Sequence, residues 1–285
     1  MKRVPGLREE IQAWAELPGR EQARRLLLAG LPAGVVEGER NRRMLRRLSA
    51  FTTRPGSARL AREARLDLLP PGALADLDRV VDVGANEGLW SLAVLALARP
   101  IQLVAVEASP HMIPKLSARL HGWAAVSVIA AAVGETPGMI PFNITDHSHS
   151  ASVLEARVEE MNELYGWGYK LVEQVTVPMT TLDEITNAFA HVSLLKIDVQ
   201  GYERAVLAGA PATLRKTRWL LIEANFRSHY QGDMLFPEMH ERLESSGFHL
   251  IGMSPPSIRS GYAMWADALY EHVGWGCNPV RSSDR

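Results

Sequence analysis

The chain has 285 residues, of which 47% are hydrophobic and 22% are charged, and this composition is typical of a globular protein and unlike a disordered or fibrous one. The net charge is −1, so no overall positive field points to a nucleic-acid partner. A single cysteine, Cys277, excludes an intramolecular disulfide framework and a cysteine-rich zinc site, and it favours a reducing compartment.

The first 75 residues differ from the rest in charge and predicted structure. They carry 15 basic and 8 acidic residues, whereas the remainder carries 16 basic and 24 acidic residues. Leu7, Ile11 and Trp14 are spaced as one face of a helix, and two further short helices are predicted before Pro70-Pro71-Gly72. We therefore expect a helical extension over residues 1–75 and a main domain over residues 76–285. The extension is a candidate dimer surface or a cap over a cleft.

From residue 77 onward, short apolar strands alternate with helices. Helices are predicted at Leu89–Ala98 and at Pro110–Leu120, where Pro110 would stand in the first turn. Near-continuous apolar strands joined by helices indicate an α/β fold with a parallel sheet. The expected strands are Arg79–Gly84, Ile101–Glu107, Val126–Val133, Val192–Asp198 and Arg218–Ala224, followed by a closing pair at Phe248–Met253 and Ala263–Tyr270.

An insert interrupts this alternation over residues 134–171. A strand is predicted at Met139–Ile144 and a helical stretch at 153–164, and an extra strand follows at Val172–Met179. The polar stretch between the first strand and the helical stretch contains Ser150. Trp167, after the helical stretch, stands among glycines and tyrosines. Such an insert is typical of a substrate loop or lid, and we expect Ser150 and Trp167 to contact a substrate.

The segment Val80–Gly88 (VVDVGANEG) is the strongest local motif, because a strand meets a glycine turn and then a helix. Gly84 would allow a sharp turn, and Gly88 would allow close approach of a ligand. A dinucleotide fingerprint needs glycine at the second and third positions, which here are Asn86 and Leu89. The carboxylate of Asp82 suits a ligand that bears an ammonium group, such as S-adenosylmethionine.

Glu107 ends the second predicted strand, 19 residues after Gly88. A carboxylate in this place can accept both hydroxyls of an adenosine ribose, in NAD enzymes and in S-adenosylmethionine enzymes alike. The small side chains after the third strand, Ala132 among them, would let an adenine ring lie flat.

Five segments together resemble the FkbM family of S-adenosylmethionine-dependent methyltransferases: VVDVGANEG at 80–88, VEASP at 106–110, AAVGE at 131–135, TLDEI at 181–185 and LLKIDVQGYE at 194–203. The segment WADALY at 265–270 resembles the closing strand of the family. The resemblance implies a class I methyltransferase (Rossmann-like) fold, with a seven-stranded sheet whose last strand is antiparallel. It also implies O-methylation of a hydroxyl on a sugar or a secondary metabolite.

The same resemblance implies which residues hold the cofactor. Glu107 would hold the ribose, Asp198 would face the transferred methyl group, and the loop would line the methionine part. Family members often carry Glu where this chain has Gln200, so a second carboxylate is missing from that place. The expected cofactor contacts are Asp82, Gly84, Ala85, Asn86, Gly88, Glu107, Ala108, Ala132 and Asp198.

Transfer of a methyl group to an alcohol needs a base or a metal that lowers the pKa of the hydroxyl. The candidate bases are Asp198 and the histidines His147, His149 and His229, with His149 and His229 preferred because they lie on loops at the expected active face. Asp198, Glu223 and Asn225 end neighbouring strands and form an alternative Mg²⁺ site. Our hypothesis is metal-independent transfer with a histidine base, and with Asn225 contacting the acceptor.

Two other functions remain open at this point: an NAD-type oxidoreductase, and a non-catalytic module that binds a partner through its N-terminal helices. A nucleic-acid methyltransferase is disfavoured, because the fourth strand is followed by Asp198-Val199-Gln200-Gly201 rather than by a motif for amino-group methylation. The expected partner is a small hydroxyl acceptor, a glycoside or other natural product. No apolar run reaches the roughly 18 residues of a membrane span, and no signal peptide is evident, so a cytoplasmic location is expected.

Overall fold

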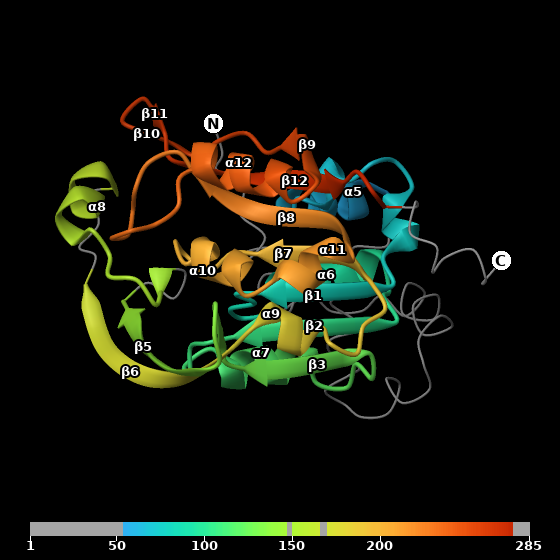
Figure 1. The fold of residues 1–285 in the computed structure, drawn as a ribbon, viewed down its shortest axis with the longest axis horizontal. Coiled ribbons are helices and arrows are strands. Elements are labelled where there is room, and N and C mark those ends of the chain that lie inside the picture. The colour runs from blue at the N-terminus through green and yellow to red at the C-terminus, as the bar shows by residue number, and fades with distance from the viewer. Residues whose placement is uncertain (1–53, 147–149, 166–169, 276–285) are drawn as a thin grey trace.

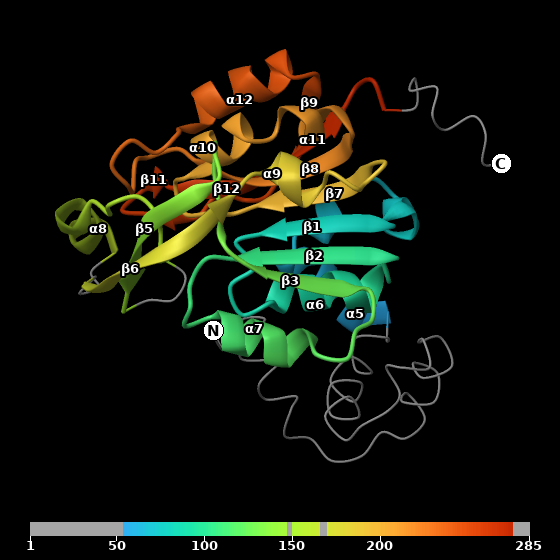
Figure 2. The ribbon, with the colours of Figure 1, turned by 60° about the horizontal axis from the view of Figure 1, so that its bottom comes forward.

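A computed structural model describes residues 54–146, 150–165 and 170–275. Its main feature is a seven-stranded sheet in the order β3-β2-β1-β7-β8-β12-β9, with helices on both faces (Figure 1, Figure 2). Only β12, the last strand, runs antiparallel to its neighbours. The predicted fold class is therefore confirmed. The strands are β1 (Arg79–Val83), β2 (Gln102–Glu107), β3 (Val126–Ala130), β7 (Val192–Ile197), β8 (Thr217–Asn225), β9 (Phe248–Met253) and β12 (Trp265–His272).

Alternate residues of the central strands face opposite layers of helices. Val80 and Leu194 point to one layer, and Val81 and Leu195 point to the other. All four side chains are fully buried. This burial on both faces explains why the central strands are apolar without polar alternation. One layer holds α5 (Arg54–Glu63), η2 (Leu66–Leu68), η3 (Ala73–Asp76), α6 (Leu89–Leu97) and α7 (Ile113–Leu120); the other holds α9 (Leu182–Ile185), α10 (Glu203–Ala208), α11 (Pro211–Arg215) and α12 (Phe236–Ser245).

The described end of the N-terminal extension packs on the main domain. Leu60 and Leu66 are buried in the same cluster as α6. The indole N–H of Trp90 donates to the carbonyl oxygen of Ala64 at 2.9 Å, and Arg65 forms an ion pair with Asp267 at 2.8 Å. The predicted helices before residue 54 lie outside the described residues.

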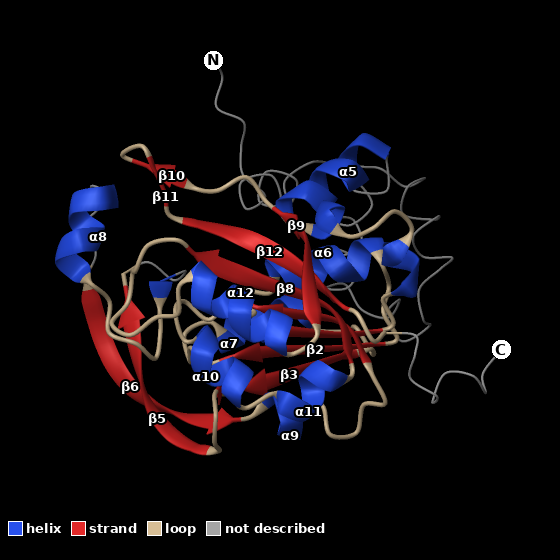
Figure 3. Ribbon diagram, turned by 45° about the horizontal axis from the view of Figure 1, so that its top comes forward, coloured by secondary structure: helices blue, strands red, loops and turns tan. Residues whose placement is uncertain are grey.

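The insert and the strands that flank it form a second sheet in the order β4-β6-β5, made of β4 (Ala132–Val133), β5 (Gly138–Thr145) and β6 (Leu171–Thr180). The long β5–β6 hairpin curves away from the carboxyl ends of the main strands and carries α8 (Val158–Tyr165) (Figure 1). A small hairpin of β10 (Ile258–Arg259) and β11 (Tyr262–Ala263) lies next to the start of β12 (Figure 3).

Several predicted boundaries were wrong, among them the start of the helical stretch 153–164, since α8 begins at Val158. The stretch Val126–Val133 is not one strand, because Ala131 separates β3 from β4 and the two belong to different sheets. Helix α7 begins at Ile113 rather than at Pro110, and Pro114 occupies its first turn. None of the helices in the described part of the chain has the length and apolar character that a bilayer crossing requires.

Candidate functional site

A cavity of about 390 Å³ opens at the carboxyl ends of β1, β2, β7 and β8. This is the place where the strand order reverses, since β1 leads to β2 on one side and is paired with β7 on the other. Open α/β sheets bind their ligands at this switch point. The insert supplies the remaining wall with Phe142, Ser150, Ala151, Val153 and Met161.

The turn after β1 forms part of the cavity floor. Gly84 has a φ of +77°, and the N–H groups of Gly84 and Ala85 donate to the carbonyl oxygen of Val106 at 3.0 and 2.9 Å. A Cβ atom on Gly84 would stand 1.8 Å from the carbonyl oxygen of Asp198. Glycine is therefore required here by backbone conformation and by contact with β7.

Gly88 has a different role from the one expected. Its φ is +78°, but a Cβ atom would meet the side chain of Leu116 at 2.6 Å. Gly88 does not line the cavity, so its small size serves the packing of α7 against the start of α6 and not the approach of a ligand.

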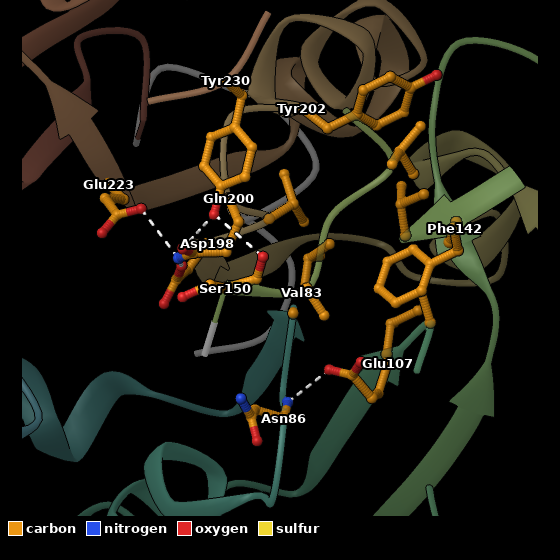
Figure 4. A pocket seen from close by; sticks show the side chains of 18 of the residues that line it. Val83, Asn86, Glu107, Phe142, Ser150, Asp198, Gln200, Tyr202, Glu223 and Tyr230 are labelled. Carbon is orange, nitrogen blue, oxygen red and sulfur yellow. Dashed lines mark hydrogen bonds between the residues drawn. The ribbon is translucent and has the colours of Figure 1, made fainter. Parts of the chain in front are cut away.

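Glu107 lies at the end of β2 and is 7% exposed. One carboxylate oxygen accepts the backbone N–H of Asn86 at 2.6 Å (Figure 4), and the other accepts that of Ser109 at 2.7 Å. Burial raises the pKa of Glu107, and the two N–H donors oppose that rise. The carboxyl group is thus fixed in orientation at the cavity wall, with lone pairs left for further donors.

Asp82 is placed below the cavity and not on it. Its carboxylate is fully buried, accepts the Ser91 hydroxyl at 2.6 Å, and lies 3.4 Å from the ammonium of Lys196. The same ammonium lies 3.3 Å from Asp198. Burial by itself lowers the pKa of Lys196, but the Asp198 and Asp82 carboxylates raise it above its ordinary value. Lys196 therefore stays charged and links the buried Asp82 to Asp198, which directly follows β7.

At the other end of the cavity, Gln200 lies between two carboxyl groups. Its side-chain amide nitrogen donates to Asp198 at 2.8 Å and to Glu223 at 3.2 Å (Figure 4). The pKa of Glu223 is raised well above its ordinary value, by burial first and then by the neighbouring Asp198 and Glu203 carboxyl groups.

His229 and Asn225 lie together beside this group. His229 is 4% exposed, and its Nδ1 lies 3.2 Å from the side-chain oxygen of Asn225. Burial lowers the pKa of His229, although Asp233 acts in the opposite direction. The imidazole is therefore neutral at pH 7, and the contact with the Asn225 oxygen assigns its proton to Nδ1 and its lone pair to Nε2.

The insert is fastened to the loop that carries His229. The N–H of Arg157 donates to the carbonyl oxygen of His229 at 2.9 Å, and the N–H of Gln231 donates to that of Glu155 at 2.8 Å. The hydroxyl of Tyr230 donates toward the carbonyl oxygen of Ser150 at 3.3 Å. These contacts make the insert a wall of the cavity in the described structure.

Most of the predicted site residues are brought together. Ala85, like Asp82 and Gly88, is absent from the cavity lining. His147, His149 and Trp167 lie outside the described residues, so the predictions for them stay predictions. The predicted residues that line the cavity are Gly84, Asn86, Glu107, Ala108, Ala132, Ser150, Asp198, Glu223, Asn225 and His229.

The alternative Mg²⁺ site is not supported. Asp198, Glu223 and Asn225 do share the cavity, but the amide of Gln200 stands between the two carboxyl groups. Within the part of the chain that the structure describes, no group of three or more histidine, cysteine, aspartate or glutamate side chains is placed to hold a metal ion.

Sequence reasoning missed several cavity residues: Phe142, Met161, Tyr230 and Trp265. They come from the insert, from the loop after β8 and from the start of β12, and no common spacing connects them. Gln200 was noticed only as a departure from the family pattern, and its bridging position depends on a left-handed backbone (φ +57°) that the sequence does not announce.

Comparisons with known proteins agree with this architecture. The pattern of the family described as "Methyltransferase FkbM domain" matches residues 82–250. The "2-O-methyltransferase NoeI" of Sinorhizobium fredii is 24% identical over 186 residues, which cover 63% of this chain and 75% of that protein.

Two solved structures are more distant. Methyltransferase FkbM from Methylobacillus flagellatus is 16% identical with a TM-score of 0.48, and the match covers 87% of this chain and 58% of that chain. Fibrillarin from Aeropyrum pernix, solved with natively bound S-adenosyl-L-methionine, is 13% identical with a TM-score of 0.42, covering 73% of this chain and 72% of that chain.

The family match extends from Asp82, at the end of β1, to Leu250 in β9, and it includes the cavity floor, the insert and the loop of His229. It spans more than half of the chain, and the strand order is the one that the family resemblance implied. The chain belongs to the FkbM family and is a methyltransferase.

Proposed function

We propose that this protein transfers a methyl group from S-adenosylmethionine to a hydroxyl of a sugar or a secondary metabolite. The observation that carries the proposal is the division of one cavity into two ends. Glu107, held by two backbone N–H groups, lies at one end, and the polar group of Asp198, Asn225 and His229 lies at the other.

The residues of the first end fit an adenosyl group. Glu107 would accept the ribose hydroxyls, and the small side chains of Ala108 and Ala132 with the ring of Phe142 provide an apolar surface for adenine. The turn through Gly84 and Asn86 would receive the amino-acid part. Asp82 would act there only indirectly, by keeping Lys196 in place below the floor.

The second end is suited to activate a hydroxyl. Bound S-adenosylmethionine supplies an electrophilic methyl group on a positively charged sulfur. His229, neutral at pH 7, would accept the hydroxyl proton while the acceptor oxygen takes the methyl group and the sulfur keeps the electron pair of the broken bond. Asn225 would hold the imidazole in orientation, and Asp198 adds negative charge facing the sulfonium side.

The character of the acceptor is supported by the relative named as a 2-O-methyltransferase, since that name specifies oxygen as the methylated atom. The acceptor end offers carboxyl, amide and imidazole groups, which pair with hydroxyls, and the ring of Trp265 at its edge offers an apolar face. These are the features that bind a polyhydroxylated ring.

Titration calorimetry tests the cofactor. S-adenosylmethionine and its demethylated product should release heat with a single site per chain, while NADH should not. Incubation with S-adenosylmethionine and a panel of glycosides should then give a product about 14 mass units heavier per methyl group, and a methyl-labelled cofactor should place the label on oxygen. A folded protein that binds neither form of the cofactor would refute the proposal.

A further inference from the structure

The side chain of Gln200 joins three parts of the cavity. It follows β7 with a left-handed backbone, and its amide nitrogen lies 2.8 Å from Asp198 Oδ1 and 3.2 Å from Glu223 Oε2. Its own oxygen lies 3.2 Å from the hydroxyl of Tyr230 and shares the single proton of that hydroxyl with the carbonyl oxygen of Ser150. Every polar atom of the carboxamide is therefore engaged, and the ends of β7 and β8 are joined to the loop after β8 (Figure 4).

The backbone of Gln200 also holds the insert. The hydroxyl of Ser152 donates to the carbonyl oxygen of Gln200 at 2.7 Å, and the same hydroxyl oxygen accepts the N–H of Leu154 at 3.0 Å. Ser152 is 1% exposed, so this contact is sealed from water. A shift of Gln200 would be transmitted to both the floor and the wall of the cavity.

The electrostatic setting makes the position of the amide unusual. Two carboxyl groups that share one neighbour normally need a cation or a shared proton between them, because like charges repel at short distance. Lys196 forms an ion pair with Asp198, whereas it acts on Glu223 only as the last-named of the charges that affect that carboxyl group. The charged and titratable groups that surround Glu223 and the amide are Lys196 on β7, Asp198 directly after β7, Glu203 on α10, Asp267 on β12, Tyr230 in the loop and, beyond Lys196, Asp82 on β1.

We propose that Gln200 is a positioning residue that holds the Asp198 and Glu223 carboxyl groups at the acceptor end of the cavity. Its carboxamide lies between them, where a metal ion or a shared proton would otherwise be needed. The two N–H groups of one amide nitrogen satisfy one oxygen of each carboxyl group without adding charge. The inference rests on the proposed function only in naming this end of the cavity the acceptor end.

A direct consequence concerns charge. Replacing the amide by an isosteric carboxyl group removes both donors and adds a third acid, so the folded protein must then recruit a proton or a divalent cation. The control is Gln231→Glu, because Gln231 is exposed in the neighbouring loop and donates to a single carboxylate, that of Glu155.

The experiment compares wild type, Gln200→Glu and Gln231→Glu by thermal unfolding between about pH 5 and about pH 8, with and without MnCl₂. For Gln200→Glu we expect a Tm near that of the wild type at the acid end, a progressive fall as the pH rises, and recovery with Mn²⁺ at the alkaline end. Electron paramagnetic resonance should detect bound Mn²⁺ in this variant only. Wild type and Gln231→Glu should show a common, smaller fall in Tm, set by the buried Glu203, and no recovery with Mn²⁺.

Gln200→Met supplies a second measurement, since methionine keeps the length and loses the donors. Its kcat should fall about 10- to 100-fold through misplacement of the acceptor groups, while the Kd for S-adenosylhomocysteine should stay within about twofold. If kcat and the affinity for S-adenosylhomocysteine fell by the same factor, Gln200 would have only a general structural role, and the proposal would be overturned.

Two further outcomes would also overturn it. One is Mn²⁺ binding by the wild type that disappears in Asp198→Asn, and the other is a Gln200→Glu variant whose Tm follows pH and Mn²⁺ as Gln231→Glu does. These measurements need no acceptor and no turnover, so they decide the role of Gln200 even where the proposed methyl transfer fails its own test.

Discussion

Single residues in this site act through groups that orient them. Glu107 is the clearest case, because backbone N–H groups of Asn86 and Ser109 hold its two oxygens before any ligand arrives. A carboxylate that is already oriented loses little entropy on binding, which makes it an effective partner for a pair of hydroxyls.

Glu107→Gln should weaken binding of S-adenosylhomocysteine about 10- to 100-fold, since a hydrogen bond to a charged acceptor contributes about 1.5–3 kcal/mol. Titration calorimetry measures the change. Glu173→Gln, at an exposed position on β6, is the matched control and should leave the Kd unaltered. Equal Kd values for the two variants would remove Glu107 from the cofactor site.

His229→Asn keeps a donor toward Asn225 and removes the base, so kcat should fall by about 10²–10⁴ while cofactor affinity is retained. Because burial lowers the pKa of His229, the wild-type rate should decline only below the ordinary pH range of histidine titration, and this acid limb should vanish in the variant. Stopped assays across pH measure both effects. His249→Asn, exposed on β9, should change neither, and a His229→Asn variant with a wild-type rate and acid limb would exclude His229 as the base.

At the scale of elements, the sequence predicted the strands and helices of the main domain well, because burial on both faces gives β1, β2 and β7 a largely apolar character without regular polar alternation. It could not show that Val126–Val133 divides between two sheets, since β3 and β4 are equally apolar and separated by one small residue. The insert was recognised by its polar loop. Its attachment to the loop of His229 depends on backbone contacts such as Arg157 to His229, and these have no residue signature.

The site was predictable where a residue stands at the end of a strand, as Glu107, Asp198, Glu223 and Asn225 do. It was not predictable where side-chain direction decides the role. Asp82 likewise stands near the end of a strand, β1, yet its side chain points away from the cavity toward Ser91 and Lys196. A position at the end of a strand does not by itself show to which face of the sheet the side chain points.

Three glycines with positive φ offer a graded test of the turns that connect the elements. Gly72→Ala meets no atom within 4 Å and should cost about 1–2 kcal/mol for the left-handed backbone alone. Gly88→Ala adds a contact with the movable side chain of Leu116 and should cost more, and Gly84→Ala collides with the backbone of Asp198 and should cost the most, above about 4 kcal/mol. Urea denaturation gives the order, and equal costs at the three positions would contradict it.

At the scale of the whole molecule, several acids are gathered beneath the cavity with few cations among them. Glu203 is 1% exposed, one of its oxygens accepts the N–H groups of Val199 and Gly201, and its other oxygen has no hydrogen-bond partner in the described structure. Burial raises the pKa of Glu203 to about 7. The folded protein therefore holds protons that the unfolded chain releases near the ordinary pKa of glutamate.

Because the folded pKa of Glu203 is raised, the folded state is favoured at acid pH and loses that advantage as the pH rises from about 4.5 through about 7. The free energy of unfolding should fall over this window by an amount on the order of 3 kcal/mol. Denaturation curves across pH measure it, and Glu203→Gln should flatten the profile. A wild-type profile that stays level or rises would show that Glu203 is ionised throughout.

The contact between Gly84 and the carbonyl of Asp198 has a consequence for attempts to redirect this enzyme to new acceptors. The turn after β1 and the end of β7 lie so close together that substitutions in either segment are expected to displace the other. Substitutions that alter the acceptor are better introduced on the β5–β6 hairpin and α8, at positions that do not make the hydrogen bonds to the loop of His229, because these elements lie away from the turn after β1.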